Sequence, residues 1–191
     1  MTASLLGVLL AAGAGTRMGR PKALIRDATG VPWVVEGFRM LRAAGCDRVV
    51  IVLGAEADAA RALVPADADV AIAADWALGL SASLRAGLEF AAGTHTDAVL
   101  VSLVDLAGLP PAVGRRVVDA AGSAPGAERH ASLARAVFDG RPGHPVLIGR
   151  DHWSAVATEV SGDAGAGAYL ARHDAVRVEC GDLSAGLDRD R

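Results

Sequence analysis

Short, mainly apolar runs alternate along the chain with longer segments in which apolar residues recur at helical spacing. The runs at 5–10, 48–53 and 98–105 are rich in leucine and valine, a pattern typical of strands that are buried on both faces. Residues 34–44 carry charged residues among apolar ones and stop before Gly45, which predicts a helix with a glycine end. This alternation predicts βαβ units, and therefore an α/β fold whose mainly parallel sheet is covered by helices on both faces.

The rest of the chain continues the same alternation. The pattern predicts a helix at 56–64 that ends at Pro65, a strand at 70–73, a helix running through Ala92, a helix after Pro110, a strand at 130–137, a turn and strand at 140–148, a helix at 164–172 and a last strand at 175–180.

Composition and charge narrow the class of protein. We expect residues 1–191 to form one domain with a substantial core. A formal net charge of −3 argues against a surface that coats nucleic acid. The apolar runs are shorter than the roughly 18 residues needed to cross a bilayer, so we expect no membrane-spanning segment. No basic segment precedes the first run, so we expect no signal peptide. The widely spaced Cys46 and Cys180 are expected to be reduced and buried, as in a cytoplasmic protein.

A glycine-rich loop follows the first apolar run. Gly13, Gly15 and Gly19 are interleaved with Arg17 and Lys22. Glycines let backbone N–H groups approach a polyphosphate closely, while Arg17 can offer a bidentate fork and Lys22 a compact point charge. The spacing fits neither the P-loop nor the dinucleotide-binding fingerprint. The loop therefore predicts a nucleotide phosphate site of another kind.

A second candidate lies at the end of the run 98–105, which finishes on Asp105. Ligands of open α/β sheets bind at the carboxyl ends of strands, so Asp105 should face the glycine loop. Mg²⁺ is usually held by one or two carboxylates together with substrate phosphates, and Mn²⁺ is a possible substitute. We interpret Asp105 as the metal ligand; the alternative is a cap for the helix after Pro110.

The glycine loop resembles the signature L-A-A-G-x-G-x-R-M-G-x-P-K of the MobA-like nucleotidyltransferases, and is most similar to that of their molybdenum cofactor cytidylyltransferase members. The matching residues are Leu10, Ala11, Ala12, Gly13, Gly15, Arg17, Met18, Gly19, Pro21 and Lys22. The resemblance implies a Rossmann-like three-layer sandwich of the nucleotide-diphospho-sugar transferase type. It also implies that Leu10, Ala11 and Ala12 line the nucleotide site.

Three further segments resemble the same family. Gly79, Ser81 and Ser83 lie where its members form the substrate pocket, although either serine is also suited to cap the following helix. His144, in a G-H-P element, is a substrate contact or a structural hydrogen-bond donor. Asp163 is a helix cap or part of an acceptor loop.

Two segments depart from the family pattern. The proline of its D-x-P turn comes three residues late, at Pro110, and the acidic tail is shortened to Asp188 and Asp190. A solvated terminus is the simpler interpretation of that tail.

The resemblance implies transfer of CMP from CTP to a phosphate-bearing acceptor, molybdopterin, with release of pyrophosphate. Arg17 would hold the β and γ phosphates, Lys22 the charge at the α phosphate, and Asp105 the metal. The methyl group of Ala12 would narrow the space beside the base, which suits a pyrimidine. A molybdoenzyme partner is compatible with this function. The alternatives are a sugar-1-phosphate or 2-phospholactate nucleotidyltransferase, a GTP-using molybdopterin guanylyltransferase, and a non-catalytic nucleotide- or cofactor-binding chaperone.

Overall fold

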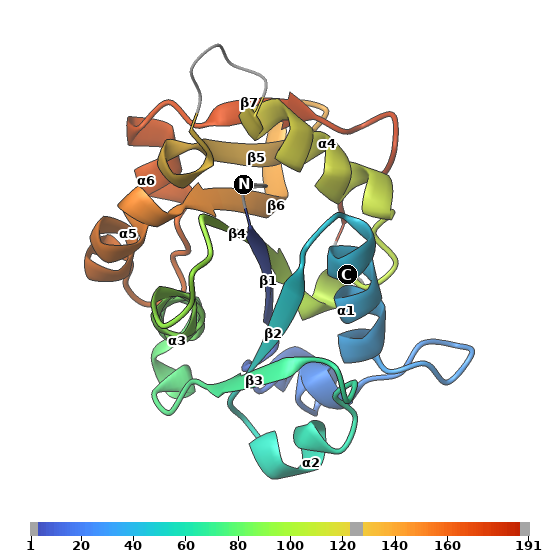
Figure 1. Ribbon diagram of the computed structural model, residues 1–191. Helices are drawn as coiled ribbons and strands as arrows, with labels where there is room; N and C mark the ends of the chain where they lie inside the picture. Colours follow the sequence, from blue (N-terminus) through green and yellow to red (C-terminus); the bar gives the residue numbers. More distant parts are fainter. Residues whose placement is uncertain (1–3, 123–127, 188–191) are drawn as a thin grey trace.

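The computed structural model describes residues 4–122 and 128–187, with the side chain of Arg17 left out. Seven strands form one sheet in the order β3-β2-β1-β4-β6-β5-β7 (Figure 1). The strands are β1 (Leu5–Leu10), β2 (Arg48–Leu53), β3 (Asp69–Ile72), β4 (Ala98–Leu103), β5 (Leu133–Phe138), β6 (Arg141–Gly149) and β7 (Val176–Glu179). The α-helices are α1 (Trp33–Ala43), α2 (Ala57–Arg61), α3 (Leu80–Ala92), α4 (Pro111–Gly122), α5 (Trp153–Glu159) and α6 (Gly167–Arg172). Single 3₁₀ turns cover Thr16–Met18, Lys22–Leu24, Trp76–Leu78, Val104–Leu106, Arg129–Ala131 and Arg150–His152.

The strand pairing confirms a mainly parallel sheet. β1 pairs in parallel with β2 and β4, β2 with β3, and β5 with β7, whereas β6 runs antiparallel to both β4 and β5. From β1 the chain winds first toward β3 and then returns to the other side of β1 as β4. The carboxyl ends of β1 and β4 are therefore a topological switch point, where open α/β sheets bind ligands.

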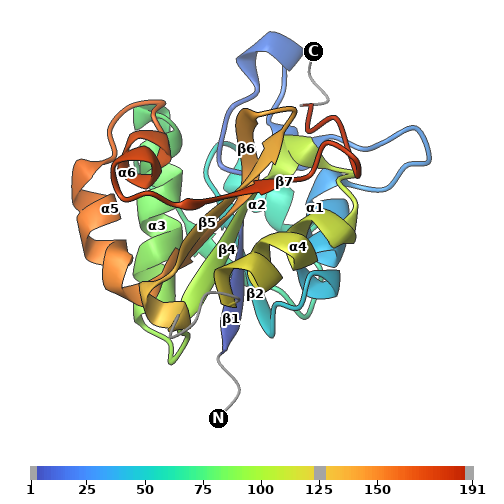
Figure 2. The ribbon, with the colours of Figure 1, turned by 90° about the horizontal axis from the view of Figure 1, so that it is seen from above.

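Helices cover both faces of the sheet, which confirms the three-layer sandwich (Figure 2). Leu5 and Leu9 of β1 pack on the face covered by α1 and α4, while Leu6, Val8 and Leu10 pack under α3, α5 and α6. All six residues of β1 are buried. A strand covered on both faces needs apolar side chains at every position, which explains the unbroken apolar run.

Several elements differ from the sequence prediction. The strand predicted at 98–105 ends at Leu103, so that Asp105 lies in a 3₁₀ turn. The helix predicted at 56–64 stops at Arg61, and that predicted at 164–172 begins at Gly167. The pattern missed α5, a short helix whose Trp153 is buried.

Three capping interpretations were wrong. Gly79, at φ 104°, is the N-cap of α3, so neither Ser81 nor Ser83 caps that helix. The N-cap residue of α6 is Ala166 rather than Asp163.

Both cysteines are buried free thiols, as predicted. Burial raises the pKa of Cys46 to about 12. Within the described part of the chain, no helix has the length and apolar character needed to cross a membrane.

Candidate functional site

A cleft of about 580 Å³ opens at the switch point. Its floor is the end of β1 and the glycine loop, and its walls come from the turn after β4 and the segment that leads into α3. This volume is within the range of small-molecule and cofactor sites. The fold therefore brings three segments that are distant in sequence to the edge where a ligand is expected.

The glycine loop keeps its shape because two of its glycines adopt left-handed backbone angles. Gly15 has φ 59° and Gly19 has φ 72°. A side chain at Gly15 would also collide with the carbonyl group of Arg20. Gly13 differs, since it is exposed and an added Cβ would meet open space. Gly13 is thus the position where the backbone is open to a close ligand.

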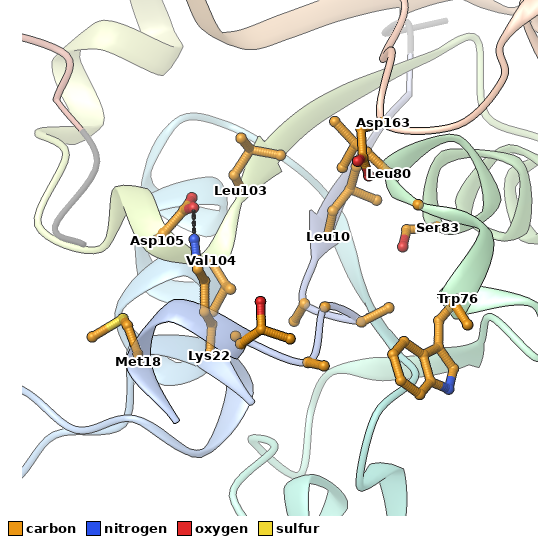
Figure 3. Close-up of a pocket in the computed structure, with 18 residues that line it drawn as sticks. Leu10, Met18, Lys22, Trp76, Leu80, Ser83, Leu103, Val104, Asp105 and Asp163 are labelled. Atoms are coloured by element: carbon orange, nitrogen blue, oxygen red, sulfur yellow. Dashed lines mark hydrogen bonds and ion pairs between the residues drawn. The ribbon is translucent and has the colours of Figure 1, made fainter. Parts of the chain in front are cut away.

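Lys22 and Asp105 form an ion pair at one side of the cleft. The Lys22 ammonium donates to Oδ2 of Asp105 over 2.6 Å, although the residues are 83 positions apart (Figure 3). Their side chains are only 21% and 13% exposed, so solvent screens the pair less than a surface ion pair. Lys22 is also the only lysine in the sequence. The structure therefore places a compact cation beside the carboxylate that was predicted as metal ligand.

The donor set at Asp105 suits a hard divalent cation. Its Oδ1 is buried without a hydrogen-bond partner in the structure, whereas Oδ2 accepts from Lys22. Among residues 4–122 and 128–187, no three His, Cys, Asp or Glu side chains gather to hold a metal. A cation here would be held by Asp105 together with ligand oxygens, which is the usual way of binding Mg²⁺. Five residues separate Asp105 from α4, so it does not cap that helix.

The opposite wall contains a tryptophan that the sequence analysis did not select. Trp76 and Ser83 lie on the side of the cleft away from the Lys22–Asp105 pair (Figure 3). An added Cβ at Gly54 would lie 2.6 Å from Cβ of Trp76, so the glycine after β2 makes room for this residue. Asp163 also lines the cleft, from the loop before α6. The available sequence signal for Trp76 was an aromatic residue in the turn that follows a predicted strand.

The predicted site residues separate into three groups. Those that line the cleft are Leu10, Ala11, Ala12, Gly13, Gly15, Lys22, Gly79, Ser83 and Asp105. Those that lie outside its lining are Gly19, Ser81 and His144. The side chain of Arg17 and the tail residues Asp188 and Asp190 are outside the described part of the structure.

His144 and Ser81 lie close to the cleft without lining it. Ser81 is wholly buried, and its backbone N–H donates to the carbonyl oxygen of Gly162. His144 faces a second cavity between α3, α6 and the sheet. Burial, together with the positive charge of Arg135, lowers the pKa of His144 to about 4, while Asp105 acts in the opposite direction. His144 is therefore a neutral imidazole at neutral pH.

Comparison with known proteins places the chain in a family. The model of the MobA-like NTP transferase domain matches residues 7–176. The nicotine blue oxidoreductase of Paenarthrobacter nicotinovorans is 40% identical over 96% of this chain and 91% of its own, and the molybdenum cofactor guanylyltransferase of Rhodobacter capsulatus is 30% identical over 81% and 68%.

The fold is shared with solved structures. Rv0371c of Mycobacterium tuberculosis H37Rv superposes with a TM-score of 0.75 at 25% identity, covering 100% of this chain and 94% of its own. A manganese complex of Rv0371c, at 23% identity and covering 93% of this chain and 88% of its own, superposes with a TM-score of 0.71. Together with the loop and the cleft described above, these matches show that the chain belongs to the MobA-like nucleotidyltransferase family.

Proposed function

We propose that the protein transfers CMP from CTP to a phosphate-bearing acceptor, molybdopterin, and releases pyrophosphate. The observation that carries this proposal is the Lys22–Asp105 pair, which faces the glycine loop inside the cleft at the switch point. The acceptor's phosphate oxygen attacks the α-phosphorus of CTP, the new O–P bond forms in line, and the bond to the β-phosphate breaks. This oxygen is ionised near neutral pH, so the reaction needs no strong base.

The contribution of the protein is positioning and charge stabilisation. Lys22 stabilises the charge that develops on the α-phosphate and on the leaving oxygen. Backbone N–H groups around Gly13 bind the departing pyrophosphate, where the loop is open. Arg17 is assigned to the β and γ phosphates from its place in the loop.

Asp105 is assigned to the divalent metal, Mg²⁺ with Mn²⁺ as a substitute. The unpartnered Oδ1 of Asp105 and the manganese complex of Rv0371c both support this assignment. A bound cation would neutralise phosphate charge beside Lys22. Asp105→Asn should therefore weaken the Mg²⁺ dependence of nucleotide binding, whereas Asp58→Asn, an exposed carboxylate on α2, should not. An unchanged Mg²⁺ titration of Asp105→Asn would remove Asp105 from the metal site.

The preference for cytosine rests on Ala12 and Trp76. Ala12 is buried at the start of the loop, and an added Cβ at Gly54 would lie 2.8 Å from its methyl group and 2.6 Å from Trp76. Both residues also line the cleft, where the methyl group of Ala12 takes up room beside a bound base and so favours the smaller base, and the indole of Trp76 offers a surface for stacking. The related guanylyltransferase makes GTP the main competitor.

A thermal-shift titration with CTP, GTP, ATP and UTP, each with and without Mg²⁺, tests the nucleotide. Ligands that bind the native state raise Tm by mass action. The largest metal-dependent shift is expected with CTP. A shift led by GTP would assign the guanylyltransferase alternative, and no shift at millimolar concentration would refute a nucleotide site.

Pyrophosphate release tests the acceptor. We expect release when CTP and Mg²⁺ are combined with molybdopterin, and none with 2-phospholactate or a sugar 1-phosphate. Release with one of the latter would assign that rival acceptor. Tight CTP binding without release in any mixture would favour the non-catalytic chaperone.

A second candidate is an oxidoreductase, because the relative at 40% identity is named for nicotine blue and is aligned over almost the whole chain. The same loop can hold the pyrophosphate of a dinucleotide. The test is a thermal shift with NADH and NADPH, followed by loss of nicotinamide absorbance when nicotine blue is added. Hydride transfer with no pyrophosphate release would establish this function in place of the transferase.

A further inference from the structure

A second cavity, of about 170 Å³, lies beside the nucleotide cleft. The two share Leu10 and Leu80 as wall residues, so they are adjacent. Apart from His144 the side chains that line it are apolar, and the small residues at 165–167 form the wall on the side of α6. An apolar cavity of about 150 Å³ holds a benzene ring. This cavity therefore has the size and polarity for one flat ring.

Arg135 lies at the edge of this cavity. On β5 it pairs in register with Val146 of β6, which lines the cavity, and with Arg177 of β7. An added Cβ at Gly167, another lining residue, would lie 4.0 Å from a terminal nitrogen of the Arg135 guanidinium. The guanidinium is thus within reach of a group bound at the end of the cavity near α6.

Among residues 4–122 and 128–187, no ion pair with a carboxylate is found for Arg135. Its Nε is buried without a hydrogen-bond partner in the described structure. Burial and the like charge of Arg177 both lower the pKa of Arg135. Like charges directly opposite each other on neighbouring strands are destabilising, and a half-buried cation without a partner costs stability. A ligand oxygen with negative charge would remove both costs.

We propose that the adjacent cavity receives a flat ring of the acceptor, and that Arg135 binds an anionic or carbonyl oxygen carried by that ring. This inference deepens the proposed transfer to a small acceptor. It rests on that proposed function for the identity of the occupant. The acceptor is then a molecule with two recognised ends. Its phosphate lies at the Lys22–Asp105 end, and its ring occupies the apolar cavity with the ring oxygen at Arg135. Arg135 acts as a specificity-determining residue.

Benzoate is the probe for this site, because it combines one six-membered ring with one carboxylate. Titrations of the ¹⁵N-labelled full chain are followed by NMR, with benzyl alcohol as a ring without charge and acetate as a charge without the ring. We expect benzoate to shift the amide signals of residues 165–167 and of Val146. Its affinity should be at least about tenfold higher than that of either control probe, since both interactions contribute.

Two variants test the two halves of the proposal. Arg135→Met should weaken benzoate binding about tenfold and leave benzyl alcohol unchanged, because it removes a charge-assisted hydrogen bond. Arg172→Met is the matched control: this arginine is exposed at the end of α6 and paired with Glu159, and its loss should change neither probe. Gly167→Leu should weaken both ring probes, because the new side chain occupies the end of the cavity.

The thermal stability of the Arg135→Met variant is a further readout, because it distinguishes a ligand-binding arginine from one that only stabilises the fold. Arg135→Met should raise Tm in the absence of ligand, because it removes an unpaired charge, and any loss of stability would contradict the proposal.

Equal binding of benzoate to wild type and Arg135→Met would overturn the role of Arg135, and shifts confined to other regions would overturn the cavity. Titration of CTP into the same samples, followed by the same amide signals, distinguishes a failure of the cavity proposal from a failure of the nucleotide site.

Discussion

Replacing Lys22 with methionine removes the ammonium of the Lys22–Asp105 pair while keeping most of the aliphatic stem. If Lys22 stabilises transition-state charge, turnover should fall by about 10²- to 10³-fold, the loss seen when one preorganised donor is removed. The assay is pyrophosphate release from CTP, Mg²⁺ and molybdopterin. Lys22→Arg is the companion variant: it keeps the charge but spreads it over a wider plane, so it should restore only part of the activity.

The same substitution has a calculable effect on stability. Asp105 would keep one buried oxygen without a hydrogen bond and would lose the 2.6 Å contact of the other. Breaking a buried pair costs about 3–5 kcal/mol, and because these side chains are 21% and 13% exposed we reduce this to about 1–2 kcal/mol. For a chain of this length each kcal/mol corresponds to about 2–4 °C in Tm.

A double variant separates the two effects. Lys22→Met combined with Asp105→Leu removes both charges, and replacing both members of a pair by apolar groups is often nearly neutral for stability. The double variant should therefore recover most of the Tm lost in Lys22→Met and remain inactive. Near-normal turnover in Lys22→Met would refute the assigned role of Lys22, and an unchanged Tm would refute the energetic argument.

The single lysine also permits a direct measurement on the unmodified chain. Reductive methylation can reach only Lys22 and the N-terminal amine. CTP with Mg²⁺ should protect Lys22 and leave the N-terminal amine as an internal control, with both followed by mass spectrometry.

Three further predictions concern Trp76, His144 and Gly87. Trp76→Ala should weaken CTP binding by about 1–3 kcal/mol if the indole stacks on the base, whereas Leu78→Ala, on the same turn and 62% exposed, should have no effect; equal losses in a titration would refute stacking. Burial lowers the pKa of His144 from its ordinary value of 6.5 to about 4, so the folded protein binds this proton less readily than the unfolded chain. The free energy of unfolding is therefore highest above pH 6.5 and decreases as the pH falls toward 4. Denaturant unfolding should show this acid sensitivity in wild type and less of it in His144→Gln, and identical pH profiles would contradict the assignment. Gly87→Ala would place a Cβ 2.6 Å from Val8 on the central strand and should lower stability by about 1–3 kcal/mol; Gly93→Ala, with its nearest contact at 3.5 Å, is the tolerant control, and equal Tm values for the two variants would show that α3 can move.

Much of the fold could be predicted because its signals are local. The strands at 5–10 and 48–53 have the predicted bounds, since an unbroken apolar run between polar ends is what a strand covered on both faces requires. Helix ends were less accurate. Ser81 and Ser83 have the residue type of a cap, yet both are buried within α3 and Gly79 is its N-cap. Residue type alone did not distinguish capping from packing.

The sequence by itself determined the alternation of strands and helices, the glycine loop and the family to which that loop belongs. Each of these depends on residues that are near neighbours along the chain. Only the tertiary structure decided that Lys22 meets Asp105, that Trp76 faces them across the cleft, and that Arg135 lies beside Gly167 with its Nε unpartnered among the described residues. These contacts join residues far apart in sequence, and they depend on strand order and register, which hydrophobic periodicity does not encode.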